Sequence, residues 1–154
     1  MKLYFLRHGQ AAWPDWQGAD DDRPLTKAGR KEMRAAAEFF AGLKFKPNAI
    51  VSSPLPRAYQ TADLLAEALG LTTVQEELLA PGFDTRKLSK LLAKYAEQDL
   101  VLVGHEPDFS SLIRALTGAE IKMAKAGLAR VDVGDSKQLH GTLVWLIPPR
   151  VSAK

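Results

Sequence analysis

The clearest strand signal of the chain is the apolar run Leu100-Val101-Leu102-Val103, which the turn Gly104-His105-Glu106-Pro107 follows. A short run without polar residues is typical of a strand that is buried on both faces, as in a parallel sheet. The turn is expected to lead into a helix that ends near Gly118. This stretch therefore predicts a buried strand that carries a histidine at its carboxyl end.

Two earlier stretches repeat this arrangement. Residues 3–6 form an apolar run that stops at Arg7-His8-Gly9, and residues 49–51 form another that stops at Ser52-Ser53-Pro54. We expect Ser52-Ser53-Pro54 to supply an N-cap and a first-turn proline for a helix that runs to Leu69 and stops at Gly70. Each stretch predicts a buried strand with a polar turn at its carboxyl end.

The rest of the sequence alternates between strand and helix patterns. Apolar residues at helical spacing predict a helix capped by Thr26 and a second one over residues 85–95. Residues 71–74 predict another strand, and residues 129–133 and 142–147 predict a late antiparallel pair. The alternation indicates an α/β protein, a three-layer α/β/α sandwich with a mostly parallel sheet. Because the 154 residues contain no linker or repeat, we expect residues 1–154 to form a single domain.

Composition excludes several classes of function. The net charge is only +3, and 10 basic and 10 acidic residues up to residue 77 are followed by 11 and 8, so we expect no nucleic acid or membrane partner. The absence of cysteine excludes a disulfide scaffold, a thiolate nucleophile and a cysteine-ligated metal. The first apolar run is too short for a signal peptide, and no stretch of about 18 apolar residues follows, which predicts a cytoplasmic protein.

The three polar turns are expected to meet at one crevice, because ligands of open α/β sheets bind outside the carboxyl ends of the strands. The crevice would hold Arg7, His8, Arg57 and His105, with no cluster of metal-binding carboxylates beside them. Two of the turns lead into helix N-termini, which favour anions. A guanidinium in the first turn of a helix leans toward that end, and its fork of donors matches phosphate oxygens. The pattern predicts a pocket for a dianionic tetrahedral group such as phosphate.

Two histidines in such a pocket can take different parts. Clustered cations disfavour a further charge, so we expect one imidazole to stay neutral near pH 7 and to keep a lone pair for attack on phosphorus. The other would donate a hydrogen bond to the phosphoryl oxygens or carry a positive charge. Attack by the neutral ring would form a covalent phosphohistidine on the enzyme, while the arginines offset charge on the phosphoryl oxygens.

Four segments of the chain resemble the histidine phosphatase superfamily, which has the phosphoglycerate mutase-like fold. They are Leu6-Arg7-His8-Gly9, Arg23-Pro24-Leu25-Thr26-Lys27-Ala28-Gly29, Ser52-Ser53-Pro54-Leu55-Pro56-Arg57-Ala58-Tyr59-Gln60-Thr61-Ala62 and Val103-Gly104-His105-Glu106-Pro107. The short chain leaves no room for a large inserted cap, so it is most similar to the SixA-type phosphohistidine phosphatase subgroup. One departure is Gln10, where many relatives carry glutamate.

The resemblance implies a role for each motif residue. His8 would be the nucleophile, while Arg7, Arg57 and His105 would bind and polarise the phosphoryl group, without a metal or an organic cofactor. Larger relatives take a general acid either from a segment between the second and third motifs or from the position after the last histidine. Glu77 fits the first description and Glu106 the second. Glu106 is equally interpretable as a carboxylate favoured at a helix N-terminus.

The expected activity follows from the chemistry of the leaving group. An imidazole that is already protonated departs neutral, whereas an alkoxide needs a proton in the transition state, so a site without a well-placed acid favours P–N over P–O bonds. We therefore expect a metal-independent phosphatase that acts on phosphohistidine in a protein, such as a histidine-containing phosphotransfer domain. The alternatives are a phosphomonoesterase or mutase acting on small phosphorylated metabolites, and a module that binds phosphate without turnover.

Other polar and aromatic residues have less specific interpretations. The triplet Asp20-Asp21-Asp22 is expected to be a solvated loop rather than a metal site. Trp13 and Trp16 either form a pocket rim or pack their loop onto the body. The remaining predictions are positive potential at the crevice from Lys122 and Lys125, and an ordinary surface position for His140.

Overall fold

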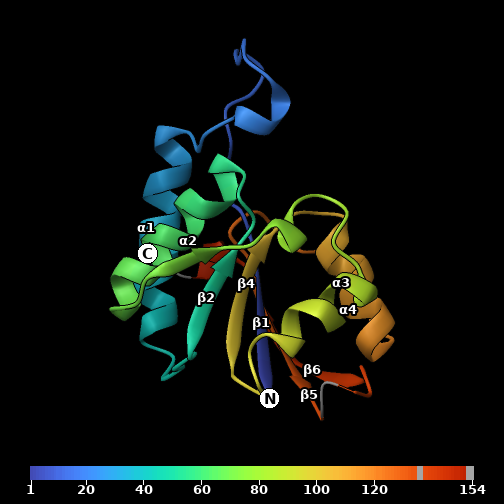
Figure 1. The fold of residues 1–154 in the computed structure, drawn as a ribbon. Coiled ribbons are helices and arrows are strands. Elements are labelled where there is room, and N and C mark those ends of the chain that lie inside the picture. The colour runs from blue at the N-terminus through green and yellow to red at the C-terminus, as the bar shows by residue number, and fades with distance from the viewer. Residues whose placement is uncertain (135–136, 152–154) are drawn as a thin grey trace.

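One six-stranded sheet forms the centre of the structure (Figure 1). The computed structural model describes residues 1–134 and 137–151. The strands are β1 (Lys2–Arg7), β2 (Ala49–Ser52), β3 (Thr73–Gln75), β4 (Leu100–Gly104), β5 (Leu128–Val133) and β6 (Gly141–Ile147). Their order across the sheet is β3-β2-β4-β1-β5-β6.

The sheet is parallel on one side and antiparallel on the other. β4 lies between β1 and β2 and is parallel to both, and β3 extends the parallel part beyond β2. β5 is antiparallel to β1 and to β6, which confirms the predicted late pair. The carboxyl ends of β2, β4 and β1 therefore lie side by side at one edge of the sheet.

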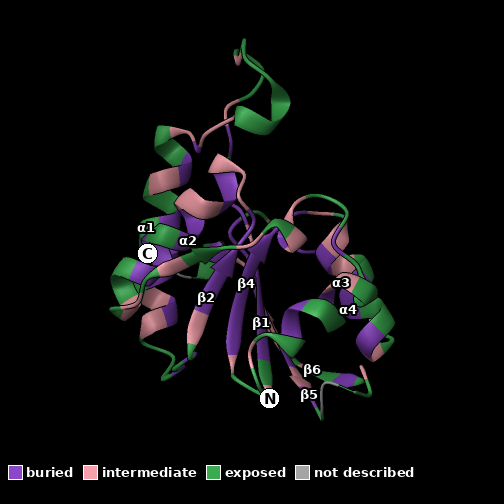
Figure 2. Cartoon of the chain, in the orientation of Figure 1, coloured by how far each residue is buried: buried purple, intermediate pink, exposed green. Residues whose placement is uncertain are grey.

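Helices cover both faces of this sheet, as the three-layer prediction requires. They are α1 (Lys27–Ala41), α2 (Pro56–Leu69), α3 (Thr85–Ala93) and α4 (Asp108–Thr117). The buried residues form two hydrophobic clusters, one that includes α1 and α2 and one that includes α3 and α4. Because successive strand residues point to opposite faces, Leu3 and Phe5 of β1 pack in the second cluster and Tyr4 and Leu6 in the first. Figure 2 shows the central strands almost wholly buried between the two helical layers.

Local signals explain some of the helix ends. Thr26 caps α1 as predicted, since its side chain accepts a hydrogen bond from the backbone N–H of Gly29. α2 ends at Leu69, and Gly70 takes the left-handed conformation with φ of 68° that favours glycine. The prediction that Ser52-Ser53-Pro54 caps α2 is wrong, because the helix begins at Pro56 and no side chain caps it.

Three short 3-10 turns complete the secondary structure, namely η1 (Asp20–Asp22), η2 (Glu77–Leu79) and η3 (Pro149–Val151). The long segment before Thr26 therefore contains one turn of helix and a single β-bridge between Ala11 and Leu25. Across residues 1–134 and 137–151, no helix has the length and apolar character that crossing a membrane requires.

Candidate active site

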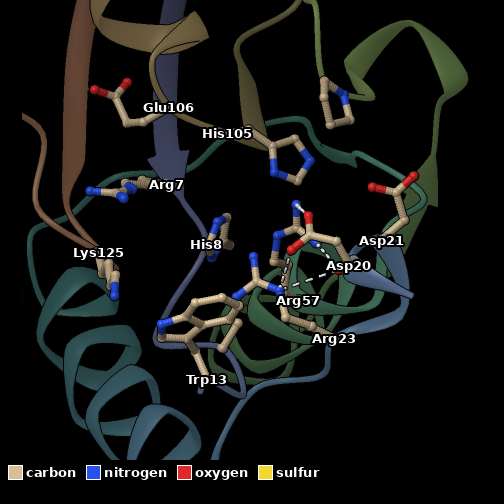
Figure 3. A pocket seen from close by; sticks show the side chains of 12 residues that line it. Arg7, His8, Trp13, Asp20, Asp21, Arg23, Arg57, His105, Glu106 and Lys125 are labelled. Carbon is tan, nitrogen blue, oxygen red and sulfur yellow. Dashed lines mark hydrogen bonds and ion pairs between the residues drawn. The ribbon is translucent and has the colours of Figure 1, made fainter. Parts of the chain in front are cut away.

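A cavity of about 570 Å³ opens at the carboxyl ends of the parallel strands (Figure 3). The side chains that line it come from the turns after β1 and β4, from the start of α2, and from loops far apart in the chain. They are Arg7, His8, Ala11, Trp13, Asp20, Asp21, Arg23, Arg57, Pro81, His105, Glu106 and Lys125. The four residues expected to share a crevice are thus brought together.

Strand register places the two histidines next to each other. Arg7 at the end of β1 pairs with Gly104 at the end of β4, so His8 and His105 are each the first residue beyond paired strand ends. The backbone N–H of His8 donates to the carbonyl of Gly104 at 3.1 Å. The two imidazole centroids lie 5.4 Å apart, and both rings are buried in the cavity wall.

The two arginines are held by backbone carbonyls. Nη1 of Arg7 donates to the carbonyl of Met123 at 2.9 Å, and Nη1 of Arg57 donates to that of Asp20 at 3.1 Å. Arg57 lies in the first turn of α2, as predicted, and is 6% exposed. The Asp20 carboxylate stands 4.0 Å from Nη2 of Arg57. These contacts fix the guanidinium groups while leaving other donors for a ligand.

Three buried nitrogen atoms of these residues have no hydrogen-bond partner among the described residues. They are Nε of Arg7, Nε of Arg57 and Nδ1 of His105. Buried polar atoms in proteins are nearly always hydrogen-bonded, and an unpaired one is costly. All three residues line the same cavity, so the site has donors to spare for an anionic ligand.

The hydrogen bond of His8 determines which ring nitrogen is available. Nδ1 lies 2.7 Å from the carbonyl oxygen of Gly9, which can only accept, so Nδ1 carries the proton. Nε2 then keeps its lone pair. The turn is itself fixed, because the N–H of Gly9 donates to the hydroxyl of Thr61 at 3.0 Å and that hydroxyl donates to the carbonyl of Arg57 at 2.7 Å. Thr61 thus couples the His8 turn to the helix that carries Arg57.

His105 has the opposite arrangement. Its Nε2 lies 2.8 Å from the hydroxyl oxygen of Ser53, which already accepts a hydrogen bond from the N–H of Leu55 at 3.3 Å. The Ser53 hydroxyl has one hydrogen to donate, and among the described residues Nε2 of His105 is the acceptor within its reach, which places the ring proton on Nδ1. Nδ1 is the atom without a partner, and Figure 3 shows the His105 ring pointing into the cavity. Ser53 makes His105 a donor toward a ligand.

Burial keeps both rings neutral. Loss of solvent lowers the pKa of His8 to about 3, a shift that His105, Arg57 and Arg7 reinforce and the Gly9 carbonyl opposes. Burial, together with the charge of Arg57, lowers the pKa of His105 to about 4, although Asp108 acts in the other direction. One neutral imidazole was expected, and both His8 and His105 are neutral. His105 therefore acts as a neutral hydrogen-bond donor rather than as a cation.

The two carboxylates considered as acids occupy different places. Glu106 lines the cavity, but its oxygens accept hydrogen bonds from the N–H and the hydroxyl of Ser110 at 2.8 and 2.7 Å. It thereby occupies the N-terminus of α4, which was expected to face an anionic ligand. Its charge also raises the pKa of Arg7, although burial of Arg7 outweighs this effect. Glu77 begins η2 and is absent from the cavity lining.

Some residues of the loop before α1 line the cavity and others do not. Trp13 is 73% exposed and lines the cavity, whereas the indole N–H of Trp16 donates to the carbonyl of Ala19 at 2.7 Å within the loop. Asp20, Asp21 and Asp22 are exposed, as expected for a solvated loop, and the first two also line the cavity. The described residues contain no group of His, Asp or Glu suited to a metal.

The two lysines expected near the crevice differ in position. Lys125 lines the cavity but Lys122 does not. His140 is exposed, as expected for an ordinary surface position.

Comparison with known proteins places this geometry in a family. The model of the histidine phosphatase superfamily (branch 1) matches residues 3–80. The chain belongs to this superfamily. An uncharacterized protein of Picosynechococcus is 35% identical over 165 residues, which span 96% of this chain and 100% of that protein. The phosphohistidine phosphatase SixA of Escherichia coli is 28% identical over 97% of this chain and 94% of SixA.

Solved structures agree with the sequence comparison. The structure of the protein histidine phosphatase SixA complexed with tungstate has a TM-score of 0.86 and 26% identity, and the match covers 98% of this chain and 99% of that one. The expected family and the phosphoglycerate mutase-like fold are confirmed. This member is therefore a phosphatase of the histidine phosphatase type.

Some residues of the site were missed in the sequence. Ser53 was interpreted as a helix cap, Thr61 was quoted only within a motif, and Asp20 and Asp21 were assigned to solvent. A usable signal existed for Ser53, because it follows a buried strand directly, as His8 and His105 do. No periodicity indicates the path of the loop that brings the two aspartates to the cavity.

Proposed function

We propose that this histidine phosphatase is a metal-independent phosphohistidine phosphatase whose residues 1–154 act as one catalytic domain. The observation that carries the proposal is the convergence of His8, His105, Arg7 and Arg57 on one cavity, with Nε2 of His8 free to act as a nucleophile. The likeness to SixA, a phosphohistidine phosphatase that has been crystallised with the tetrahedral anion tungstate, supports it.

In the first step, the lone pair on Nε2 of His8 attacks phosphorus. A new N–P bond forms, the P–N bond of the substrate breaks, and its electron pair returns to the ring nitrogen of the leaving histidine. The donation of Nδ1–H to Gly9 holds the ring in orientation and stabilises the positive charge that develops on it. Because the pKa of the free ring is about 3, the nucleophile is unprotonated at neutral pH.

The other three residues stabilise the phosphoryl group. Arg7 and Arg57 present fixed guanidinium donors, and His105 donates through Nδ1 because Ser53 occupies Nε2. Donors that are already in place when negative charge develops lower the barrier without reorganisation. In the second step, water attacks the phosphorus atom of phosphorylated His8. The N–P bond breaks, its electron pair returns to Nε2, a water proton passes to a phosphate oxygen, and inorganic phosphate leaves.

A proton-transfer role for Glu106 stays a prediction. Both of its oxygens serve Ser110, although each retains a second lone pair. A P–N substrate needs less help from an acid than a P–O substrate does. We expect Glu106→Gln to lower kcat/KM less than about threefold for a phosphohistidine peptide and at least about tenfold for an aryl phosphate. Equal losses on the two substrates in steady-state assays would contradict this.

The proposed substrate is a histidine side chain of another protein rather than a small metabolite. The segment between β3 and β4 holds only η2 and the nine-residue helix α3, which is too short for a large inserted cap. A second function, hydrolysis of small phosphate esters, would depend on Glu106 as the general acid, and the hydrogen bonds to Ser110 hold this carboxylate at the start of α4.

The proposal is tested by rapid quench with radiolabelled phosphoramidate. We expect the parent chain to form a phosphoenzyme that is stable in base and labile in acid, and His8→Ala to form none. Phosphohistidine peptides should be turned over faster than phosphoserine peptides or sugar phosphates. Full turnover by His8→Ala would overturn the proposed nucleophile, and faster turnover of sugar phosphates would overturn the substrate.

A further inference from the structure

The cavity has more room than the phosphoryl group needs. Its volume of about 570 Å³ falls within the range of small-molecule sites, roughly 300–1,000 Å³. Arg7, Arg57 and the two histidines account for one part of its wall. Another part is formed by Trp13, Asp20, Asp21 and Arg23 from the loop before α1, of which the proposed mechanism uses only the Asp20 carbonyl that holds Arg57.

We propose that Trp13 and Asp21 form a leaving-group subsite that selects a protonated imidazole ring over neutral or anionic leaving groups. The inference rests on the proposed function and adds the residues that recognise the part of the substrate beyond phosphorus. This subsite adjoins the phosphoryl position in the same cavity, where Nδ1 of His105 has no partner among the described residues.

Trp13 offers an aromatic surface at the mouth of the cavity. The guanidinium carbon of Arg23 lies 5.9 Å from the centroid of the indole, and 73% of Trp13 remains exposed. Arg23 is itself held, because its Nε lies 2.9 Å from Oδ1 of Asp20. A large exposed aromatic ring beside a catalytic cavity can stack on a flat ring, and its π-face attracts a cation. An imidazolium has both properties.

Asp21 adds an unpaired carboxylate to this part of the wall, which Arg23 also lines. Asp20 is engaged by Arg23 and lies near Arg57. Burial lowers the pKa of Arg57, and the charges of Asp20 and Asp21 act in the other direction. No hydrogen bond or ion pair joins Asp21 to any other residue in 1–134 or 137–151. Figure 3 shows the Asp21 carboxylate beside the cavity, apart from Arg7 and Lys125. Arg7 and Arg57 therefore favour an anion in the cavity, and the unpaired Asp21 carboxylate favours a cation. A phosphohistidine has this pattern, because the ring nitrogen that does not bear phosphorus can be protonated near neutral pH.

The chemistry determines the sign of the effect. When the P–N bond breaks, the electron pair returns to a ring that is already protonated, and the ring loses its positive charge. Asp21 therefore interacts most strongly with the bound substrate before cleavage, so its loss appears chiefly in KM. An aryl phosphate develops negative charge on its leaving oxygen instead, and a nearby carboxylate disfavours that transition state.

The experiment compares three substrates with the full chain. They are a phosphohistidine peptide, phosphoramidate, which has a P–N bond but no ring, and an aryl phosphate. Asp21→Asn is expected to raise KM for the phosphohistidine peptide about fivefold, to leave kcat/KM for phosphoramidate within twofold, and to raise kcat/KM for the aryl phosphate about twofold. The matched control is Asp22→Asn, which lies in the same turn η1 but outside the cavity lining and should change none of these values.

Trp13 is tested in the same assays. Trp13→Ala is expected to lower kcat/KM for the phosphohistidine peptide about tenfold, and Trp13→Phe to restore most of it, because stacking needs an aromatic ring. Equal effects of Asp21→Asn on all three substrates, or no effect on any, would overturn the subsite. If the parent chain hydrolysed no P–N substrate, the proposed function itself would fail. This result differs from both outcomes for Asp21→Asn, which concern the subsite alone.

Discussion

The turns that end β1 and β4 are close in position but opposite in chemistry. Each places a buried histidine directly beyond a strand end, and the two strands are in register there. His8 bonds through Nδ1 to the backbone of its own turn, and His105 bonds through Nε2 to the side chain of Ser53 on a neighbouring strand end. One ring is left with a lone pair toward the ligand and the other with an N–H.

This difference shows that burial alone does not assign the two roles. Burial lowers the pKa of both rings, so both are neutral at pH 7. In each ring, the hydrogen-bond partner of the nitrogen that faces away from the ligand decides which tautomer forms. The tautomer then decides whether the other nitrogen attacks phosphorus or donates a hydrogen bond.

The largest difference should follow from removing the nucleophile. We expect His8→Ala to lower kcat for a phosphohistidine peptide by at least about 10³-fold, because the proposed acceptor of the phosphoryl group is removed. Binding of inorganic phosphate, measured by calorimetry, should persist because Arg7, Arg57 and His105 remain. A variant that retained a tenth of the parent kcat would contradict the assignment.

Removing the donor should have a smaller effect. His105→Ala is expected to lower kcat/KM about 100-fold, the usual cost of losing one preorganised donor to developing negative charge. A phosphoenzyme on His8 should still form slowly in rapid-quench experiments. His140→Ala, at an exposed position, is the control and should stay within twofold of the parent. Complete loss of the phosphoenzyme in His105→Ala would contradict the separate roles of the two histidines, His8 as nucleophile and His105 as hydrogen-bond donor.

The low pKa values of both histidines should make the fold sensitive to acid. In the unfolded chain a histidine binds a proton below about pH 6.5, whereas folded His8 and His105 do so only near 3 and 4. The contribution is present above pH 6.5 and is lost as the pH falls toward 4. Between pH 7.5 and 5 each histidine should lower the free energy of unfolding by about 2 kcal/mol, roughly 30-fold in the unfolding equilibrium. Urea denaturation of His8→Asn and His105→Asn should show a flatter pH dependence, and unchanged curves would contradict the low pKa values.

The smallest effect should come from the residue that sets the tautomer of His105. Ser53→Ala is expected to lower kcat/KM about tenfold and to shift the ring proton of His105 partly to Nε2, which nitrogen chemical shifts in NMR spectra report. Ser52→Ala is the matched control, because Ser52 is equally buried but bonds to the Ser53 carbonyl and not to a ring. If both variants lost the same activity with unchanged nitrogen shifts, Ser53 would have a structural role alone.

The sequence predicted the fold well where one physical signal dominates. The apolar runs around Phe5, Ile50 and Val101 have one stable arrangement, a sheet covered on both faces, and Gly70 ends α2 because it adopts a positive φ. The start of α2 was mispredicted because a serine before a proline has several possible partners. Ser53 uses its hydroxyl for Leu55 and His105 and is not a helix cap.

The site was predictable to a similar extent and for related reasons. Parallel strands end at one edge, so the convergence of His8 and His105 followed from the order of elements. Glu106 had two open interpretations, a general acid and a carboxylate favoured at a helix N-terminus. Its hydrogen bonds to Ser110 at the start of α4 agree with the second. The position of Asp21 depends on the path of an irregular loop, and no pattern in the sequence encodes that path.

The most direct test of the account identifies the phosphorylated atom. The parent chain, labelled with ¹⁵N in its histidines, is mixed with phosphoramidate and quenched in base, and phosphorus–nitrogen coupling in NMR spectra then locates the bond within the residue mapped by mass spectrometry. The account predicts the phosphoryl group on Nε2 of His8. A phosphoryl group on His105, or on Nδ1 of His8, would contradict it.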